Sequence, residues 1–488
     1  MSQSRTFKAA VLGSGQFLVI LTELLCFVVL SRIFTKTDYA SYRQTLLAYT
    51  FLAPLLALGF PRALYYFLPQ DRENGRSILT GNLLLLFLMG CLFAVAMWCG
   101  GNKFLAKRFS NPALIRLLLI FSPYALLVLP ARSISACLVS YDRVKILTIY
   151  NVISRVVVFA CILGLVLIWR SPDAAISGKV IGAVVVFLPA MFLMYRTTAG
   201  NDWRPTKANI REQMKYSVPL GMAVIVGTMN LNLDKVVVSS MCSSENFAIY
   251  VNGAMEIPLI SVVTMSITSI ILPDLVSFYK SKDYMRLIGL WRKSIVKAGA
   301  ILIPTMVFLF FMAPQVMRVL FSAGYERSAG PFRVLLLLLV MRTMSTDVIF
   351  LATNHNKLIL IRSIISLSMN LFLNILFVRV FGYIGAAIST VSIAYIWSTP
   401  FTLLFIKRIL NIKWRDVYPF ADMGKIILAS LLGSTTFVIS LFIKGMPDLV
   451  LLMIYSTLYA IVTMFFLRQF GVLDIKSLFS SIKSGFAK

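Results

Sequence analysis

The chain has 488 residues, of which 59% are hydrophobic and only 14% are charged, and its mean hydropathy is +0.85. Soluble proteins carry about 25% charged residues, so a single water-soluble core is excluded. The 47 Lys and Arg residues outnumber the 19 Asp and Glu residues, which gives a net charge of +28. Because the basic residues lie mainly in short gaps between apolar runs, we expect them to face a membrane surface or an anionic substrate and not nucleic acid.

Apolar stretches of about 20 residues, the length at which a helix crosses a bilayer, recur along the whole chain. The first of them has no clear small-residue cleavage site, so we expect it to be retained as a membrane helix. We therefore predict an all-α polytopic membrane protein with about fourteen spans. In chain order the predicted spans are 8–33, 45–68, 78–99, 112–131, 146–169, 175–195, 214–238, 247–273, 296–320, 330–352, 358–378, 383–406, 423–443 and 448–467.

The connections between spans predict the orientation. Lys and Arg are about twice as frequent in the connections on one side, which places both termini in the cytoplasm. The two longest connections, 196–213 and 274–295, are both cytoplasmic in this orientation and are too short to hold a folded domain. The second alternates cations with apolar residues such as Leu287 and Trp291 at helical spacing, so we expect it to lie along the inner headgroups.

Motifs for metal, disulfide or nucleotide chemistry are missing from the sequence. The six cysteines form no CxxC pair, which predicts neither a disulfide framework nor a zinc site. The lone His355 cannot make a metal site by itself. There is no GxxxxGK[ST] motif, so the chain has no sign of a nucleotide-driven motor, and we expect no cofactor.

Three short motifs occur twice in the same order and at nearly the same separation. They are TKTDYASY, ending at Tyr42, and SSENFAIY, ending at Tyr250; Leu68-Pro69 and Leu272-Pro273; and AAIS at Ala174–Ser177 and Ala386–Ser389. A duplicated unit with an even number of spans gives two copies that point the same way across the bilayer. The repeat therefore predicts two six-helix lobes related by an axis along the membrane normal, followed by an appended helix pair.

The repeat also sets the predicted domain boundaries. The first six spans form an N-terminal lobe at 1–200, and a cytoplasmic linker follows at 201–213. The next six spans form a C-terminal lobe at 214–410, and residues 411–488 hold the last two spans and a cytoplasmic tail.

The segments around these motifs resemble a known family. LSRIFTKTDYASYRQTLLAYTFLAPLLALGFPRALYYFLP, NLDKVVVSSMCSSENFAIYVNGAMEIPL and VRVFGYIGAAIST are similar to the bacterial polysaccharide-unit flippases of the multidrug/oligosaccharidyl-lipid/polysaccharide exporter superfamily. The resemblance implies a V-shaped pair of bundles around a central cavity, working by alternating access in the cytoplasmic (inner) membrane. It implies undecaprenyl-diphosphate-linked oligosaccharide as cargo, with membrane lipids and other polysaccharide assembly proteins as partners.

Four arginines inside or near the ends of predicted spans are candidates for binding an acidic lipid head. Arg342 and Arg155 lie well inside the tenth and fifth spans, whereas Arg62 and Arg132 lie nearer the inner ends of theirs. A guanidinium offers several donors to a phosphate and keeps its charge at any working pH, so we predict a cationic cavity. Snorkelling to the interface, or pairing with a carboxylate, is the open alternative for each arginine.

Three carboxylates are candidates for ion or proton coupling. Glu23 lies near the middle of the first span, Glu256 lies in the eighth, and Asp234 lies near the outer end of the seventh. Intramembrane carboxylates are costly and usually functional, although a static salt bridge between helices remains open for Glu23 and Glu256. We expect Asp234 not to form a self-contained pair with Lys235, because adjacent residues do not face each other on a helix.

Polar residues on the tenth and eleventh spans are further candidates. Asp347 is placed to pair with Arg362 or Lys357 as a gate. A stripe along one face of the eleventh span either lines the cavity and binds sugar hydroxyls or packs between helices. Its members are Ser363, Ser366, Asn370 and Asn374.

Three other functions compete with a lipid-linked oligosaccharide flippase. A drug/cation antiporter of the same superfamily needs a cavity of carboxylates and aromatic rings, against which the intramembrane arginines argue. A membrane polysaccharide polymerase, ligase or lipid-dependent glycosyltransferase usually needs a large outer loop, and the outer connections are short. A scaffold leaves Arg342 and Glu23 unexplained. We therefore predict a transporter, coupled to an ion or proton, and not an enzyme.

Overall fold

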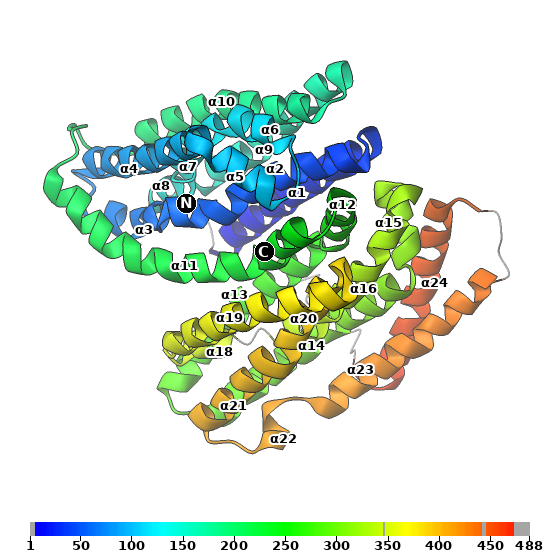
Figure 1. Ribbon diagram of the computed structural model, residues 1–488. Helices are drawn as coiled ribbons and strands as arrows, with labels where there is room; N and C mark the ends of the chain where they lie inside the picture. Colours follow the sequence, from blue (N-terminus) through cyan, green and yellow to red (C-terminus); the bar gives the residue numbers. More distant parts are fainter. Residues whose placement is uncertain (1–4, 345–346, 442–445, 473–488) are drawn as a thin grey trace. The chain divides into compact units, whose positions relative to one another are not determined.

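The computed structural model describes residues 5–344, 347–441 and 446–472, and these residues form helices and connections without any strand (Figure 1). The prediction of an all-α protein is confirmed. The contacts divide the chain into two compact units, Met1–Ala248 and Ile249–Lys488, with the division inside one helix, Ser244–Gly253.

Unit 1 contains the helices up to α12. They are α1 (Arg5–Ile33), α2 (Lys36–Ala57), α3 (Phe60–Gln70), α4 (Gly75–Ala96), the kinked segment η1 (Met97–Gly101), α5 (Asn102–Arg108), α6 (Leu114–Phe121), α7 (Pro123–Ala131), α8 (Ile134–Ser140), α9 (Val144–Trp169), α10 (Pro172–Thr197), α11 (Lys207–Met241) and the first half of α12 (Ser244–Gly253).

Unit 2 contains the rest of α12 and the helices that follow. They are α13 (Pro258–Lys280), α14 (Tyr284–Phe311), α15 (Ala313–Phe321), the 3-10 helix η2 (Ala323–Ser328), α16 (Ala329–Leu336), α17 (Leu338–Arg342), α18 (Asp347–Ala352), α19 (Asn356–Phe381), α20 (Tyr383–Ile393), the π-helical turn η3 (Ala394–Ser398), α21 (Thr399–Leu410), α22 (Trp414–Val417), α23 (Phe420–Gly433), the 3-10 helix η4 (Ser434–Leu441) and α24 (Asp448–Gln469).

Twelve helical stretches in the described residues are long and apolar enough to cross a membrane, and each overlaps one predicted span. The other two predicted spans, 247–273 and 423–443, coincide with α12–α13 and with α23–η4. Residues 442–443 of the second, and residues 473–488 of the predicted tail, lie outside the described residues. The structure therefore agrees with a polytopic protein of about fourteen helices.

Several helices begin at a residue whose side chain can cap them. The side-chain oxygens of Thr35, Ser171 and Thr206 each accept the backbone N–H three residues later, at 3.2 Å, at the starts of α2, α10 and α11. Such caps satisfy one of the four N–H groups that a helix leaves unpaired at its first turn. The predicted linker at 201–213 therefore ends inside a helix, because Thr206 starts α11.

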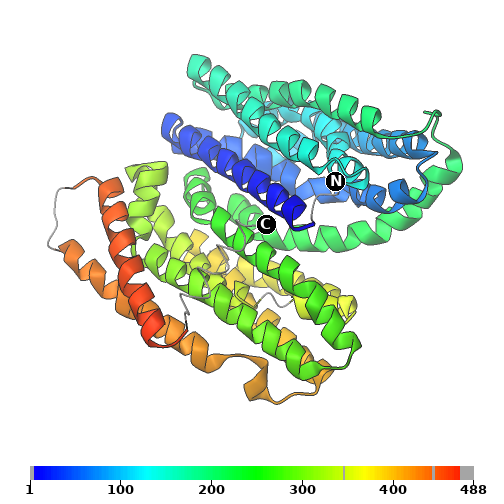
Figure 2. The same ribbon diagram turned by 180° about the vertical axis from the view of Figure 1, so that it is seen from behind.

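Helices α9 and α10 of unit 1 lie very close together, and α1 packs on α9 (Figure 2). A Cβ added at Gly178 would lie 2.6 Å from the Cys161 carbonyl oxygen, and one at Gly182 would lie 2.9 Å from the Cα of Val158. The two glycines form a GxxxG pair, the spacing that lets membrane helices approach backbone to backbone. A Cβ added at Gly15 of α1 would instead meet the side chain of Thr148 on α9.

Helix α11 is fixed against α3 and α4 by glycine and amide contacts. Gly59 has φ +77° in the turn before α3, and a Cβ there would lie 2.7 Å from the carbonyl oxygen of Ser217. Asn82 Nδ2 donates to Gln213 Oε1 at 2.9 Å, and Gln213 Nε2 donates to the Ile78 carbonyl at 3.0 Å. These buried hydrogen bonds pair amide and carbonyl groups that would have no hydrogen-bond partner in lipid hydrocarbon.

The core of unit 2 surrounds Trp291, which is completely buried. Its indole N–H donates to the Met344 carbonyl at 2.9 Å, and Leu287 is buried one turn earlier. The expectation that 274–295 lies along the headgroups was wrong: α13 runs to Lys280, and α14 begins at Tyr284. The apolar face of this segment packs on protein because the other helices of unit 2 cover it.

The repeated motifs occupy matching places in the helices. Tyr42 and Tyr250 are each the seventh residue of their helix, α2 and α12, and both are completely buried. The two AAIS motifs lie in the first turns of α10 and α20. These positions agree with a duplication, and the predicted lobe boundaries stay a prediction.

Candidate functional site

A small pocket in unit 1 collects charged side chains from different helices. Its lining includes Glu23 of α1, Tyr42 of α2, Arg155 of α9 and Lys179 of α10. The cavity measures about 20 Å³, which is room for about one water molecule. Two residues that the sequence predicted for different tasks, Glu23 for coupling and Arg155 for phosphate binding, therefore share one site.

The pocket lies deep along its helices. Glu23 precedes the end of α1 by ten residues, and Lys179 follows the start of α10 by seven. At 1.5 Å per residue these positions are roughly 15 Å from the end of α1 and roughly 10 Å from the start of α10, the two helix ends that the predicted orientation places on the outer side of a hydrocarbon core about 30 Å thick. Charges at this depth are costly, and they usually belong to a water-filled cavity or a transport path.

The three charges of the pocket are not neutralised by direct pairing. Within the described part of the chain, neither Glu23, Arg155 nor Lys179 takes part in a salt bridge. Glu23 and Arg155 are exposed, although both line the pocket. The site carries one carboxylate and two cations, so its net charge favours an anionic ligand.

The GxxxG contact explains why Lys179 reaches this pocket. Gly178 brings the start of α10 against α9, so the next residue, Lys179, lies beside the face of α9 that carries Arg155 and Val158. The sequence analysis missed Lys179, although it lies inside the predicted span 175–195. Its place beside Gly178 in a GxxxG pair was the signal that could have found it.

Aromatic rings connect the pocket to a further predicted cation. Lys179 Nζ lies 5.8 Å from the ring centre of Tyr124, whose ring is 5.2 Å from that of Tyr49. Arg132 in turn lies over Tyr49 at 5.7 Å. Cation–π contacts of this kind hold a positive charge in apolar surroundings without a carboxylate. Arg62 has an exposed side chain near the start of α3 and does not line the pocket.

In unit 2 the predicted charges are paired. Arg342 Nη2 lies 3.6 Å from Glu256 Oε1, and the two side chains are 38% and 65% exposed. Arg362 donates to Asp347 Oδ1 at 2.6 Å and to Thr402 Oγ1 at 2.8 Å. Arg362 is thus the partner of Asp347 among the two that the sequence suggested, and the role of the pair as a gate stays a prediction.

The polar stripe on α19 faces other protein atoms. Ser366, Asn370 and Asn374 are buried, and the Ser366 hydroxyl lies 3.1 Å from that of Ser398 in η3. Asn374 Nδ2 donates to the Asn370 carbonyl oxygen at 2.8 Å. These contacts are those of the interhelical packing alternative, and a lining role stays a prediction.

Asp234 of α11 is buried, and Lys235 Nζ lies 3.8 Å from its Oδ1. The two adjacent side chains thus lie within ion-pair distance, but Asp234 also interacts with a further group, so the expectation that they do not form a self-contained pair is not contradicted. Lys235 also donates to the Leu231 carbonyl at 3.0 Å, so its long side chain folds back along its own helix. Adjacent residues project from different faces of a helix, but the long, flexible side chain of a lysine can bend back to its neighbour.

Comparisons with known proteins agree with this architecture. The family model described as polysaccharide biosynthesis protein matches residues 7–278, more than half of the chain. No curated protein sequence matches the chain.

Solved structures show a similar fold at low sequence identity. A structure described as the lipid II flippase MurJ in an inward closed conformation is 17% identical, with a TM-score of 0.76 over 94% of this chain and 99% of that one. An inward-facing multidrug resistance MATE family transporter of the MOP superfamily is 17% identical, with a TM-score of 0.63 over 80% and 95%. A MOP superfamily transporter from Pyrococcus furiosus is 16% identical, with a TM-score of 0.58 over 83% and 97%. The chain belongs to the polysaccharide biosynthesis protein family and has the fold of the MOP superfamily of transporters, as the resemblance in its sequence predicted.

Proposed function

We propose that this multi-pass membrane transporter moves a lipid-linked oligosaccharide diphosphate from the inner to the outer leaflet of the cytoplasmic membrane. The excess of Lys and Arg in the connections on one side supports an orientation with both termini in the cytoplasm. The oligosaccharide and its diphosphate travel through an aqueous path inside the protein, while the lipid tail stays in the bilayer. No bond is made or broken.

The observation that carries the proposal is the unneutralised charge at Glu23, Arg155 and Lys179. A diphosphate in hydrocarbon loses its hydration at an idealised cost of tens of kcal/mol, so a translocation path must supply cations at mid-depth. Arg155 and Lys179 offer several N–H donors from two helices, and charge-assisted hydrogen bonds to phosphate are the strongest that proteins make. A permanent partner would occupy these donors, and the described residues include none.

The proposed role of Glu23 is coupling. When the diphosphate approaches Arg155 and Lys179, its negative charge repels the Glu23 carboxylate, so binding favours uptake of a proton or another cation there. When the diphosphate leaves on the outer side, this repulsion ends and Glu23 releases the proton or cation. The Arg342–Glu256 pair is proposed to act in the same way in unit 2: a phosphate that attracts Arg342 competes with Glu256 for it. Asp234 and Arg62 are assigned no step.

Deletion of the gene and mass spectrometry of lipid extracts test the proposal. Cells without the chain are expected to accumulate lipid-linked oligosaccharide on the cytoplasmic side, and the wild type is expected to clear it. The mass of the accumulated lipid identifies the sugar. Unchanged lipid-linked oligosaccharide in the deletion strain would reject the proposal.

A drug/cation antiporter is the second candidate. The same pocket sets the Glu23 carboxylate among Phe27, Tyr42 and Phe159, and a carboxylate with aromatic rings is what a cationic drug needs. MATE transporters also share the fold. Efflux of cationic dyes by cells that express the chain, without any change in lipid-linked oligosaccharide, would favour this candidate.

A further inference from the structure

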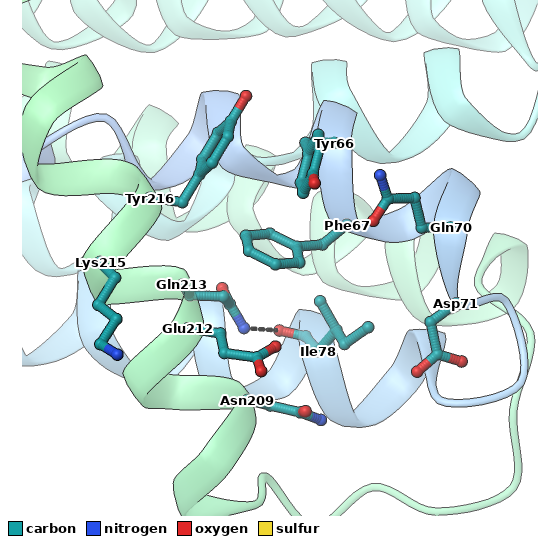
Figure 3. Close-up of a pocket in the computed structure, with 10 residues that line it drawn as sticks. All are labelled: Tyr66, Phe67, Gln70, Asp71, Ile78, Asn209, Glu212, Gln213, Lys215 and Tyr216. Atoms are coloured by element: carbon teal, nitrogen blue, oxygen red, sulfur yellow. Dashed lines mark hydrogen bonds between the residues drawn. The ribbon is translucent and has the colours of Figure 1, made fainter.

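A second and larger cavity lies in unit 1, where the first three turns of α11 cross the end of α3 and the start of α4 (Figure 3). It measures about 480 Å³, within the range of small-molecule sites. The α3–α4 connection and the start of α11 both lie on the predicted cytoplasmic side, and the helix contacts of Gly59 and Gln213 hold α11 in place beside them. None of the predicted site residues lines this cavity.

Three aromatic rings form one wall. Tyr66 of α3 stacks on Tyr216 of α11 with ring centres 4.6 Å apart, and Phe67 meets Tyr216 edge to face at 5.6 Å. Tyr66 and Tyr216 remain 44% and 40% exposed despite this contact. Figure 3 shows the rings on one side of the cavity and the polar side chains of Asn209 and Glu212 on the other.

The polar wall offers both donors and acceptors. Gln70 and Asn209 each carry an amide, Glu212 carries a carboxylate and Lys215 carries an ammonium group. Asp71 also lines the cavity, but its carboxylate already accepts the N–H and side-chain amide of Asn74 at 3.1 and 2.9 Å. Counting Asp71, the charged lining residues are two carboxylates and one cation, which repel rather than attract a phosphate.

We propose that this cavity binds a sugar residue of the cargo before translocation. The flat apolar face of a pyranose ring fits an exposed aromatic ring, and its hydroxyl groups, each both donor and acceptor, match amides and a carboxylate. The lining of this cavity is net negative, whereas the pocket at Arg155 is net positive. The cavity therefore binds the sugar, and the pocket at Arg155 binds the diphosphate. This assignment rests on the proposed function.

Binding at this cavity is also coupled to the arrangement of two helices. Tyr216 and Glu212 are on α11, the last long helix before the division between the units, whereas Tyr66 and Gln70 are on α3. A sugar held between the two helices favours the arrangement in which they lie together. Binding at this cavity therefore selects one conformation of α11 relative to α3.

Saturation-transfer NMR on the full-length protein in lipid nanodiscs tests the assignment. The probes are the methyl glycosides of glucose, galactose, mannose and N-acetylglucosamine. We expect transfer to at least one of them, roughly tenfold weaker binding in Tyr66→Ala, and weaker binding in Glu212→Gln. Tyr65→Ala is the matched control, because Tyr65 is 46% exposed on the same helix and does not line the cavity.

Three outcomes would overturn the sugar site. They are no transfer to any glycoside, equal transfer in the Tyr66→Ala and wild-type proteins, and displacement of the glycoside by tetraphenylphosphonium through a Tyr66-dependent cation site. Gel filtration of each variant shows that it is folded. If glycoside binding fails while the deletion strain accumulates lipid-linked oligosaccharide, the sugar site alone is rejected. If glycosides bind at Tyr66 and no lipid accumulates, the proposed transport is rejected instead.

Discussion

Arg155 and Lys179 illustrate how two cations can share one pocket between helices that are long and apolar enough to cross a membrane. Lys179 is supported by the ring of Tyr124 at 5.8 Å, and Glu23 lowers the net charge of the shared pocket without a direct salt bridge. Arg318 of α15 is different, because it is paired with Asp448 at the start of α24 at 2.7 Å and with Glu326 at 3.2 Å. The first arrangement suits binding and release, and the second fixes neighbouring helices.

Removal of either pocket cation is expected to slow export. Arg155→Ala and Lys179→Ala should each lower the rate roughly 10- to 100-fold, because a charge-assisted hydrogen bond contributes about 1.5–3 kcal/mol. Arg155→Lys should retain part of the activity, since it keeps the charge but loses the planar fork. The measurement is the rate at which each variant clears accumulated lipid-linked oligosaccharide. Arg170→Gln, at the exposed end of α9, is the control; an equal defect there would contradict a local role.

Trp291 gives a prediction about stability. Trp291→Ala removes a fully buried ring and leaves the Met344 carbonyl without its 2.9 Å hydrogen bond. We expect a loss of about 3–5 kcal/mol, measured by thermal or denaturant unfolding in detergent. Trp414→Ala, at a residue that is 49% exposed, should change stability little. Equal stability of the two variants would mean that the 284–295 segment is not packed as described.

At the scale of elements, the close contact of α9 and α10 forms the wall of the cationic pocket. Two glycines on one face of α10 let the backbones meet, and this contact sets the position of Lys179 relative to Arg155. Small residues are a common means of helix association in membranes, where lipid removes most of the hydrophobic driving force between helices.

Gly178→Leu should therefore disturb both stability and transport. The added side chain meets the backbone of α9, and overpacking of this kind costs about 1–3 kcal/mol. Gly164→Leu is the matched control on α9 itself, because a Cβ at Gly164 meets open space. Thermal unfolding of the purified variants measures the effect. A Gly164 variant as unstable as the Gly178 variant would show that the α9–α10 contact does not cause the loss, because leucine favours the helix more than glycine does at both positions.

At the scale of the whole molecule, the predicted orientation can be tested with native cysteines. Cys99 is exposed near the predicted outer end of α4, and Cys242 follows α11 on the same predicted side. Burial raises the pKa of the Cys242 thiol, which slows its reaction because the thiolate is the reactive form. In single-cysteine variants, a membrane-impermeant maleimide added outside spheroplasts should label Cys99 faster than Cys242. Labelling of Cys99 only after lysis would reverse the orientation.

The sequence predicted the class of fold because the length of an apolar run is a local property, and a bilayer imposes one length on every span. The same pattern could not show what covers an amphipathic face. Leu287 and Trp291 have the spacing of an interfacial helix, but the partner that buries them comes from distant parts of the chain. Periodicity indicates that a face is apolar and does not identify its neighbour.

The candidate site was predicted in part for a related reason. Glu23 and Arg155 stood out as charges in apolar spans, and the structure places both at one pocket. Their meeting depends on how α1, α9 and α10 pack, which single spans do not encode. The cavity at Tyr66 and Tyr216 was not foreseen, because its residues look like ordinary amphipathic helix ends until α11 is placed across α3.

In the proposed transport, the length of α11 determines where a sugar first meets the protein. A helix of 35 residues measures about 52 Å, so it exceeds the hydrocarbon thickness by some 20 Å. In the predicted orientation the part of α11 that precedes the predicted span 214–238 lies in the hydrated headgroup layer, and it carries Asn209 and Glu212. A glycan bound there stays hydrated. It enters the low-dielectric interior only after the diphosphate has bound the cations Arg155 and Lys179.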